Sequence, residues 1–156
     1  MATLPEQKYK LEKHDGIAAI IMHNKKILLL KRRNIPIILN RGVWSFLYGS
    51  RKRGERYIDA VYREISEEVK LDRSKLILLY KTTVLLKDER KRITWKNRLF
   101  LFRSSTDNIK LDFENSKYRW AAFSEIEEKS QYTNIFVREG WLLGIIKRHL
   151  ADRHET

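Results

Sequence analysis

Residues 57–69 carry two patterns on one predicted helix, and these constrain the fold more than any other part of the chain. Apolar residues recur at helical spacing, as a buried face requires. They are Ile58, Val61, Tyr62, Ile65 and Val69. Glu64, Glu67 and Glu68 fall within an arc of roughly 100° that lies largely away from this stripe. The sequence therefore predicts a helix that is anchored by its apolar face and presents three carboxylates on one patch.

Clustered carboxylates need an explanation, because like charges four residues apart destabilise a helix by a few tenths of a kcal/mol per pair. Water and salt can screen an exposed acidic face, and Arg63 lies nearby in the sequence. A divalent cation is the alternative, since Mg²⁺ takes oxygen ligands and is usually held by one or two carboxylates together with substrate phosphates. The spacing of the three glutamates by itself leaves both explanations open.

Strand patterns surround the predicted helix. The predicted strands are 16–22, 26–32, 44–46, 76–86, 93–103 and 117–123, of which the first two and the fourth and fifth form hairpins. Ser124 and Glu127 fit a capping box for a short helix, and Asn134 could cap a final helix that runs to about Leu150. The pattern predicts an α/β fold, in which helices cover both faces of a mixed sheet.

The chain has 156 residues, which suits a single domain over 1–156 with a core over about 14–150. Cysteine is absent, which excludes disulfides, thiolate metal sites and cysteine nucleophiles. No apolar run approaches the roughly 20 residues of a membrane span, and the start of the chain has no signal-peptide core. We therefore expect a cytoplasmic protein with no membrane partner.

The net charge is +13, because 33 lysines and arginines outnumber 20 aspartates and glutamates. Such an excess attracts polyanions such as nucleotides and nucleic acid, although a basic surface can also serve solubility alone. The charge thus leaves RNA open as a partner. A homodimer is equally open, because the sequence does not reveal the oligomeric state.

Residues 49–71, GSRKRGERYIDAVYREISEEVKL, place the glutamates in a longer pattern. Its polar and glycine positions are Gly49, Glu55, Arg63, Glu64, Glu67 and Glu68. This pattern resembles the box of the Nudix hydrolase (MutT-like) family, G-x5-E-x7-R-E-U-x-E-E-x-G-U, where U is bulky and apolar. Every fixed position matches except the last glycine, which is Lys70. Residues 42–46 are similar to the family's lead-in G-x-W, and residues 114–126 to its late E-x5-W-x4-E-[LI] segment.

The resemblance implies a Nudix-type α/β/α sandwich with a mixed β-sheet and the box as loop–helix–loop. It implies that Glu67 and Glu68 bind Mg²⁺, for which Mn²⁺ could substitute. Glu64 would be a further ligand, or the group that orients or deprotonates water. The backbone carbonyl of Gly49 would add a ligand.

Further roles follow from the same resemblance. Arg63 should pair with Glu55 and hold the box loop against the helix. A late acid often assists catalysis in this family, and Glu114 is the candidate, with Asp112 as a weaker competitor. Glu125 is expected instead in the first turn of a helix, where a carboxylate is favourable.

Two departures from the family pattern and several basic residues bear on the substrate. Tyr48 stands where the family has glycine and could fill a gap or stack on a base. Lys70 would need a left-handed conformation, at a cost of about 1 kcal/mol. Weak candidates for phosphate contacts are Arg32, Arg33, Arg51 and Arg53.

The implied activity is Mg²⁺-dependent hydrolysis of a diphosphate bond in a nucleotide-like substrate, by a Nudix-type pyrophosphohydrolase. Such substrates are nucleoside diphosphates linked to another group: NTPs, nucleotide sugars, ADP-ribose or dinucleoside polyphosphates. The alternatives are a pyrophosphohydrolase of RNA 5′ ends, or a non-catalytic nucleic-acid-binding module on the same fold. The three intact glutamates favour an enzyme.

Overall fold

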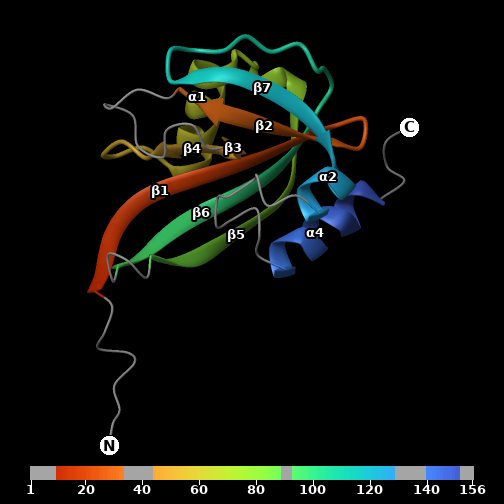
Figure 1. Ribbon diagram of the computed structural model, residues 1–156. Helices are drawn as coiled ribbons and strands as arrows, with labels where there is room; N and C mark the ends of the chain where they lie inside the picture. The colour runs from red at the N-terminus through yellow and green to blue at the C-terminus, as the bar shows by residue number, and fades with distance from the viewer. Residues whose placement is uncertain (1–9, 34–43, 89–92, 129–139, 152–156) are drawn as a thin grey trace, which may run out of the picture.

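The architecture is a seven-stranded mixed sheet with helices on both faces, seen in a computed structural model that describes residues 10–33, 44–88, 93–128 and 140–151 (Figure 1). The strands are β1 (Lys10–His23), β2 (Lys26–Arg32), β3 (Trp44–Ser45), β4 (Leu47–Ser50), β5 (Leu76–Asp88), β6 (Ile93–Ser104) and β7 (Asn115–Ala122). The helices are α1 (Tyr57–Val69), the 3₁₀ turn η2 (Arg73–Lys75), α2 (Phe123–Glu128) and α4 (Gly140–Leu150). No described helix is both long and apolar enough to cross a membrane.

The sheet runs in the order β3-β2-β1-β6-β5, with β4 also paired to β1 and β7 to β2. The pair β1–β6 is parallel and the other pairs are antiparallel, which makes the sheet mixed as predicted. Asn24 and Lys25 both have positive φ in the β1–β2 turn, as the primed hairpin turns require. This topology places the start of β7 next to the end of β2, on the side of the sheet that α1 covers.

Two apolar cores lie on opposite faces of the sheet. One joins α1, through Val61, Ile65 and Val69, to side chains such as Phe100 and Phe102 of β6. The other joins Ile126 of α2 and Ile146 and Leu150 of α4 to the opposite face of the same strands. The predicted α/β/α sandwich is therefore confirmed.

The helix predicted from apolar spacing runs over Tyr57–Val69, as expected, but one part of the prediction for its acidic face is wrong. Glu68 is 3% exposed and belongs to the buried face of α1, not to a patch away from it. The segment before β7 covers it, which helical periodicity cannot foresee. Lys70 ends the helix in the left-handed conformation (φ 57°, ψ 34°), and its amide donates to the Ser66 carbonyl.

The C-terminal helices differ in detail from the prediction. α2 begins at Phe123, so Ser124 lies inside the helix and the predicted capping box does not form its start. The amide of Ala122 instead donates to Glu125 in the first turn, where this carboxylate was expected. α4 ends at Leu150 as predicted, whereas the proposed cap at Asn134 lies outside the described residues.

Candidate active site

Arg63 ties the loop of residues 50–56 to α1. Its guanidinium donates to both carboxylate oxygens of Glu55, at 2.9 and 3.0 Å, and to the carbonyl of Ser50 at 2.8 Å. Its remaining nitrogen lies 3.1 Å from Glu64 Oε1 and 3.2 Å from Glu67 Oε2. The predicted pairing of Arg63 with Glu55 is thus present in the structure, and one cation contacts three carboxylates. We call Arg63 with these three glutamates the Arg63 network.

The ion pair of Arg63 and Glu55 shifts the pKa values of both groups toward their charged forms. The Arg63 hydrogen bonds, followed by the Lys52 amide, lower the pKa of Glu55 to about 2. The Glu55 carboxylate in turn raises the pKa of Arg63. Glu55 is therefore ionised at any physiological pH, and the loop is held by charge-assisted hydrogen bonds.

Gly49 is required by the position of Glu64. A Cβ atom at residue 49 would lie 2.3 Å from Glu64 Cδ, so any side chain there would displace the carboxylate. The next amide, of Ser50, donates to Glu64 Oε1 at 3.3 Å. Burial raises the pKa of Glu64, while the Ser50 amide and Arg63 oppose this shift. The glycine that opens the box motif thus lets β4 lie directly against a carboxylate of α1.

Glu68 differs from the other glutamates of α1, because it is buried and only partly hydrogen-bonded. Asn115 Nδ2 donates to Glu68 Oε1 at 3.1 Å. Among the described residues, Glu68 Oε2 has no hydrogen-bond partner. Burial raises the pKa of Glu68 to about 8, against the Asn115 bond, and the charges of Glu64, Asp112 and Glu114 add to the rise.

A loop just before β7 brings two more carboxylates to Glu68. One ligand oxygen from each of Glu68, Asp112 and Glu114 can be chosen so that all three lie within 4.8 Å of one another. We call these three residues the Glu68 cluster. The Asp112 amide donates to the Glu68 carbonyl, and Asp112 Oδ1 accepts from the Glu114 amide and from Asn115 Nδ2. The loop is therefore built around the end of α1.

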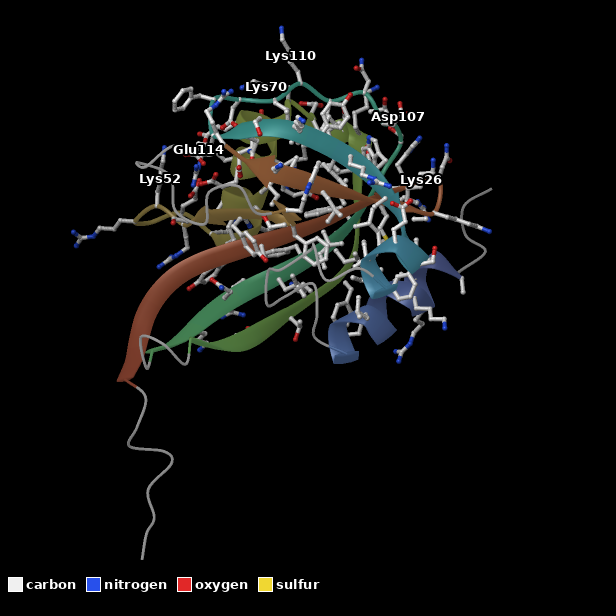
Figure 2. All side chains as sticks on the ribbon, in the orientation of Figure 1. Lys26, Lys52, Lys70, Asp107, Lys110 and Glu114 are labelled. Carbon is white, nitrogen blue, oxygen red and sulfur yellow. The ribbon has the colours of Figure 1, made fainter. Side chains whose placement is uncertain are left out.

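Arg33, at the end of β2, holds this loop from the other side. Its Nε donates to the Phe113 carbonyl at 2.8 Å, and its amide donates to the Glu114 carbonyl at the same distance. Its guanidinium carbon lies 5.3 Å from the centroid of the exposed Phe113 ring. In Figure 2, Glu114 lies on the same side of the molecule as Lys52 of the box loop and far from Lys26.

The Glu68 cluster has the chemistry of a site for a hard divalent cation. All three side chains offer oxygen, the donor that Mg²⁺ and Mn²⁺ prefer. A buried carboxylate oxygen without a hydrogen bond is costly, and a cation would compensate it. The three carboxylates are therefore suited to hold a metal ion, and the orphaned Oε2 of Glu68 is the observation that supports this.

The structure distributes the predicted site residues among several places. Glu68 and Glu114 come together, Glu64 lies close enough for its charge to act on Glu68, and Glu67 is half-exposed beside Arg63. Tyr48 packs against the core on the α2 and α4 side. Of the weak phosphate candidates, Arg33 holds the loop just before β7, and Arg51 donates to the Glu55 carbonyl. Arg53 is exposed, and the side chain of Arg32 is not described.

Sequence reasoning gave Asn115 no role and ranked Asp112 below Glu114. Asn115 is 47 positions from Glu68 along the chain and lies at the start of β7. No spacing rule connects an asparagine there with a helix so distant in the sequence. The only available signal was an acidic pair followed by a polar residue just before a predicted strand.

Comparison with known proteins agrees with the fold. A family model described as NUDIX domain matches residues 12–138. The fold is similar to that of a MutT protein from Methanosarcina mazei Go1 (20% identity, TM-score 0.68, covering 90% of this chain and 96% of that one). It is also similar to an Ap4A hydrolase from C. elegans (20%, 0.66, covering 87% and 98%) and to a MutT NUDIX hydrolase from Burkholderia pseudomallei (24%, 0.57, covering 72% and 85%). No curated protein sequence matches.

The fold and the extent of the family match define the class. The chain belongs to the NUDIX domain family, the family of the Nudix hydrolases. The sequence-based prediction of a Nudix-type pyrophosphohydrolase is confirmed at the level of this family.

Proposed function

We propose that this protein hydrolyses a diphosphate bond in a nucleoside diphosphate derivative and uses Mg²⁺, or Mn²⁺ in its place. The observation that carries the proposal is the buried carboxylate of Glu68, whose Oε2 has no hydrogen-bond partner among the described residues. An unpaired buried carboxylate destabilises a protein, and a cation bound to its oxygen would offset this cost.

Glu68 is the central metal ligand in this proposal, with Asp112 beside it and Glu64 and the Gly49 carbonyl completing the set. Glu67 is an outer ligand whose half-exposed carboxylate can reach solvent and substrate. A bound Mg²⁺ would neutralise the charge on the phosphoryl oxygens and lower the pKa of a water molecule. Mg²⁺ commonly keeps several water ligands, so the number of carboxylates is sufficient.

The protein's own groups position the reaction and move the proton. Asn115 orients Glu68 through its hydrogen bond to Oε1, and the Arg63 network holds the box loop that carries Gly49. Glu114 is exposed on the loop before β7, so it can accept the proton of the attacking water and pass it to solvent. Phosphoryl transfer depends mainly on positioning and electrostatics, which this arrangement supplies.

The names of proteins with similar folds support the proposed substrate class. One similar structure is titled an Ap4A hydrolase, another an ADP-ribose pyrophosphatase fused to an adenylyltransferase, and a third a NUDIX domain complexed with ADP ribose. NTPs, nucleotide sugars, ADP-ribose and dinucleoside polyphosphates all contain a diphosphate. The exposed Lys52 and Arg53 of the box loop would attract the anionic part of such a substrate.

A substrate panel with Mg²⁺ tests the proposal, with products identified by mass spectrometry in ¹⁸O-labelled water. We expect at least one member to be cleaved within its diphosphate, and we expect EDTA to stop the reaction. Glu125→Gln serves as the matched control for Glu68→Gln. It is the same chemical change, placed on α2 on the other side of the sheet. The proposal would be overturned if no member of the panel were cleaved, or if cleavage were equally fast in EDTA.

A further inference from the structure

A cavity of about 360 Å³ lies where the first turn of α1 meets β5 and β6. Its apolar wall includes Ile58 and Phe100, and Tyr57 lies beside them. Its cationic residues are Arg56, Lys81 and Arg98. Small-molecule sites have this size and this combination of an apolar wall with a few charged groups.

Strand pairing places the cations of β5 and β6 at this cavity. Lys81 of β5 lies opposite Phe100 of β6, and Arg98 is two residues before Phe100 on the same face. Both cationic side chains are exposed at the cavity. Within the described parts of the chain, neither has a carboxylate at ion-pair distance, whereas Arg56 is paired with Asp59. The cavity therefore carries two positive charges that no described carboxylate balances.

Tyr57 holds one of these cations in a defined orientation. The guanidinium carbon of Arg98 lies 4.7 Å from the centroid of the Tyr57 ring, and that of Arg51 lies at the same distance. A cation–π contact restrains a guanidinium, and its N–H groups can still donate two hydrogen bonds to a phosphate. Arg98 is thus preorganised as an anion contact, and Lys81 adds a flexible second contact.

We propose that this cavity binds a nucleoside monophosphate, with its phosphate at Lys81 and Arg98 and its base against the apolar wall at Ile58. A free phosphate would leave the apolar wall uncovered, and a sugar phosphate would place hydroxyl groups against it. A nucleotide satisfies both the charged and the apolar parts of the lining. This binding requires neither a metal ion nor hydrolysis.

The cavity is separate from the Glu68 cluster. None of its lining residues belongs to that cluster, which lies at the other end of α1. Tyr57 and Glu68 are eleven residues apart, which corresponds to roughly 16 Å along a helix axis. A ligand in the cavity can therefore be distinguished from one at the cluster by the residues that it perturbs.

The direct test is a titration of ¹⁵N-labelled protein with AMP in EDTA, followed by NMR. We expect chemical-shift changes at the amides of Tyr57, Ile58, Thr82 and Phe100. Adenosine, ribose 5-phosphate and inorganic phosphate should each bind at least tenfold more weakly than AMP. The proposal is wrong if AMP causes no shifts, if the shifts are confined to residues 112–115, or if any of the three fragments binds as tightly as AMP.

Charge-removing variants separate this cavity from general attraction to a basic protein. Lys81→Gln combined with Arg98→Gln should weaken AMP binding at least tenfold. Lys147→Gln combined with Arg148→Gln removes the same two charges from exposed positions on α4 and should change binding by less than twofold. An equal loss in both double variants, or no loss in the first, would overturn the proposal.

The Arg98→Gln change removes a contact with Tyr57 and could disturb the fold of the first double variant. A single variant at Lys81 avoids this problem. Lys81 is exposed, so Lys81→Gln alone should fold normally, as thermal melting would verify. It should weaken AMP binding at least threefold, and unchanged binding would again count against the site.

Discussion

The Arg63 network and the Glu68 cluster use carboxylates of the same helix in opposite ways. In the network, Arg63 contacts Glu55, Glu64 and Glu67, and the pKa of Glu55 falls to about 2. In the cluster, no described cation contacts Glu68, and burial raises its pKa to about 8. A cation of the protein contacts each carboxylate of the network, whereas no described cation contacts the buried carboxyl of Glu68.

The difference between the network and the cluster separates carboxylates that stabilise the loop from one that the proposed function uses. Charge-assisted hydrogen bonds such as those between Arg63 and Glu55 can hold a loop in place without any ligand. A buried carboxylate with an orphaned oxygen costs stability, and under the proposed function a bound cation would offset that cost. The two groups should therefore respond differently to substitution, to pH and to metal.

The largest expected effect is that of Glu68→Gln. This change keeps the shape but removes the charge that the cation needs, and we expect Mg²⁺-dependent turnover to fall by about a thousandfold or more. Circular dichroism should show an unchanged fold. Retention of full turnover would reject the assigned ligand role, and Glu125→Gln should remain as active as the wild type.

Stability without metal should depend on pH in a way that identifies Glu68. Below about pH 4.5 its carboxyl is protonated in both states, and toward pH 8 only the unfolded chain has released the proton. The free energy of unfolding in EDTA should therefore fall as the pH rises, by the order of 4 kcal/mol at about 1.4 kcal/mol per pKa unit.

Chemical denaturation in EDTA at several pH values measures this loss. Glu68→Gln should remove most of the slope between pH 5 and pH 8, and Mg²⁺ at pH 8 should restore stability to the wild type. Glu55 acts in the opposite direction, because its stabilising charge is lost only as the pH falls from about 4.5 toward 2. If Glu68→Gln left this slope unaltered, the pH dependence would arise from other titrating groups.

Glu114→Gln should lower the rate by about 10- to 100-fold and leave measurable activity, as expected for removal of one proton acceptor. The amide keeps the loop contacts, because the Arg33 bond is made to the backbone carbonyl of Glu114. The pH dependence of kcat should lose its acidic limb in this variant. An unchanged rate would remove Glu114 from the reaction.

Arg63→Met should destabilise the protein by about 2 kcal/mol, because hydrogen bonds from one half-buried cation to the loop are lost together. Arg63→Lys keeps the charge but cannot form the paired contact to Glu55, so it should recover only part of the loss. Urea unfolding measures both variants. If Arg63→Met were as stable as the wild type, the loop would be held by other contacts.

The smallest effect is expected at Lys70, where the left-handed backbone conformation is strained for a residue with a side chain. Lys70→Gly should stabilise the protein by about 1 kcal/mol, less the contribution of the bond from Nζ to the Glu67 carbonyl. Lys70→Ala is the matched control, since it removes that bond and retains the strain. A gain with alanine as large as with glycine would show that charge, and not backbone conformation, decides stability there.

Much of the fold could be predicted from the sequence because its signals are local. Apolar spacing gave the bounds of α1 correctly, and apolar or β-rich runs separated by short polar segments gave the hairpins of β1–β2 and β5–β6. The start of α2 was missed by one residue, because a side-chain cap and a first-turn carboxylate give similar patterns.

The candidate site was predicted only in part. Its residues Glu64, Glu68 and Glu114 came from a motif, but the burial of Glu68 was not foreseen. That burial depends on Asn115 and Asp112, which reach α1 only because β7 pairs with β2. A long-range pairing of this kind leaves no trace in the spacing of either segment.

The sequence by itself determined the class of this protein: an amphipathic helix with acidic residues, inside a mixed α/β sandwich of the NUDIX family. Such features follow from periodicity and from residue types, which each segment carries alone. Only the tertiary structure decided which carboxylates Arg63 contacts and which one is buried with an oxygen that has no hydrogen-bond partner among the described residues. The reason is that desolvation and charge pairing depend on distances across the fold, and those distances arise only when the segments pack together.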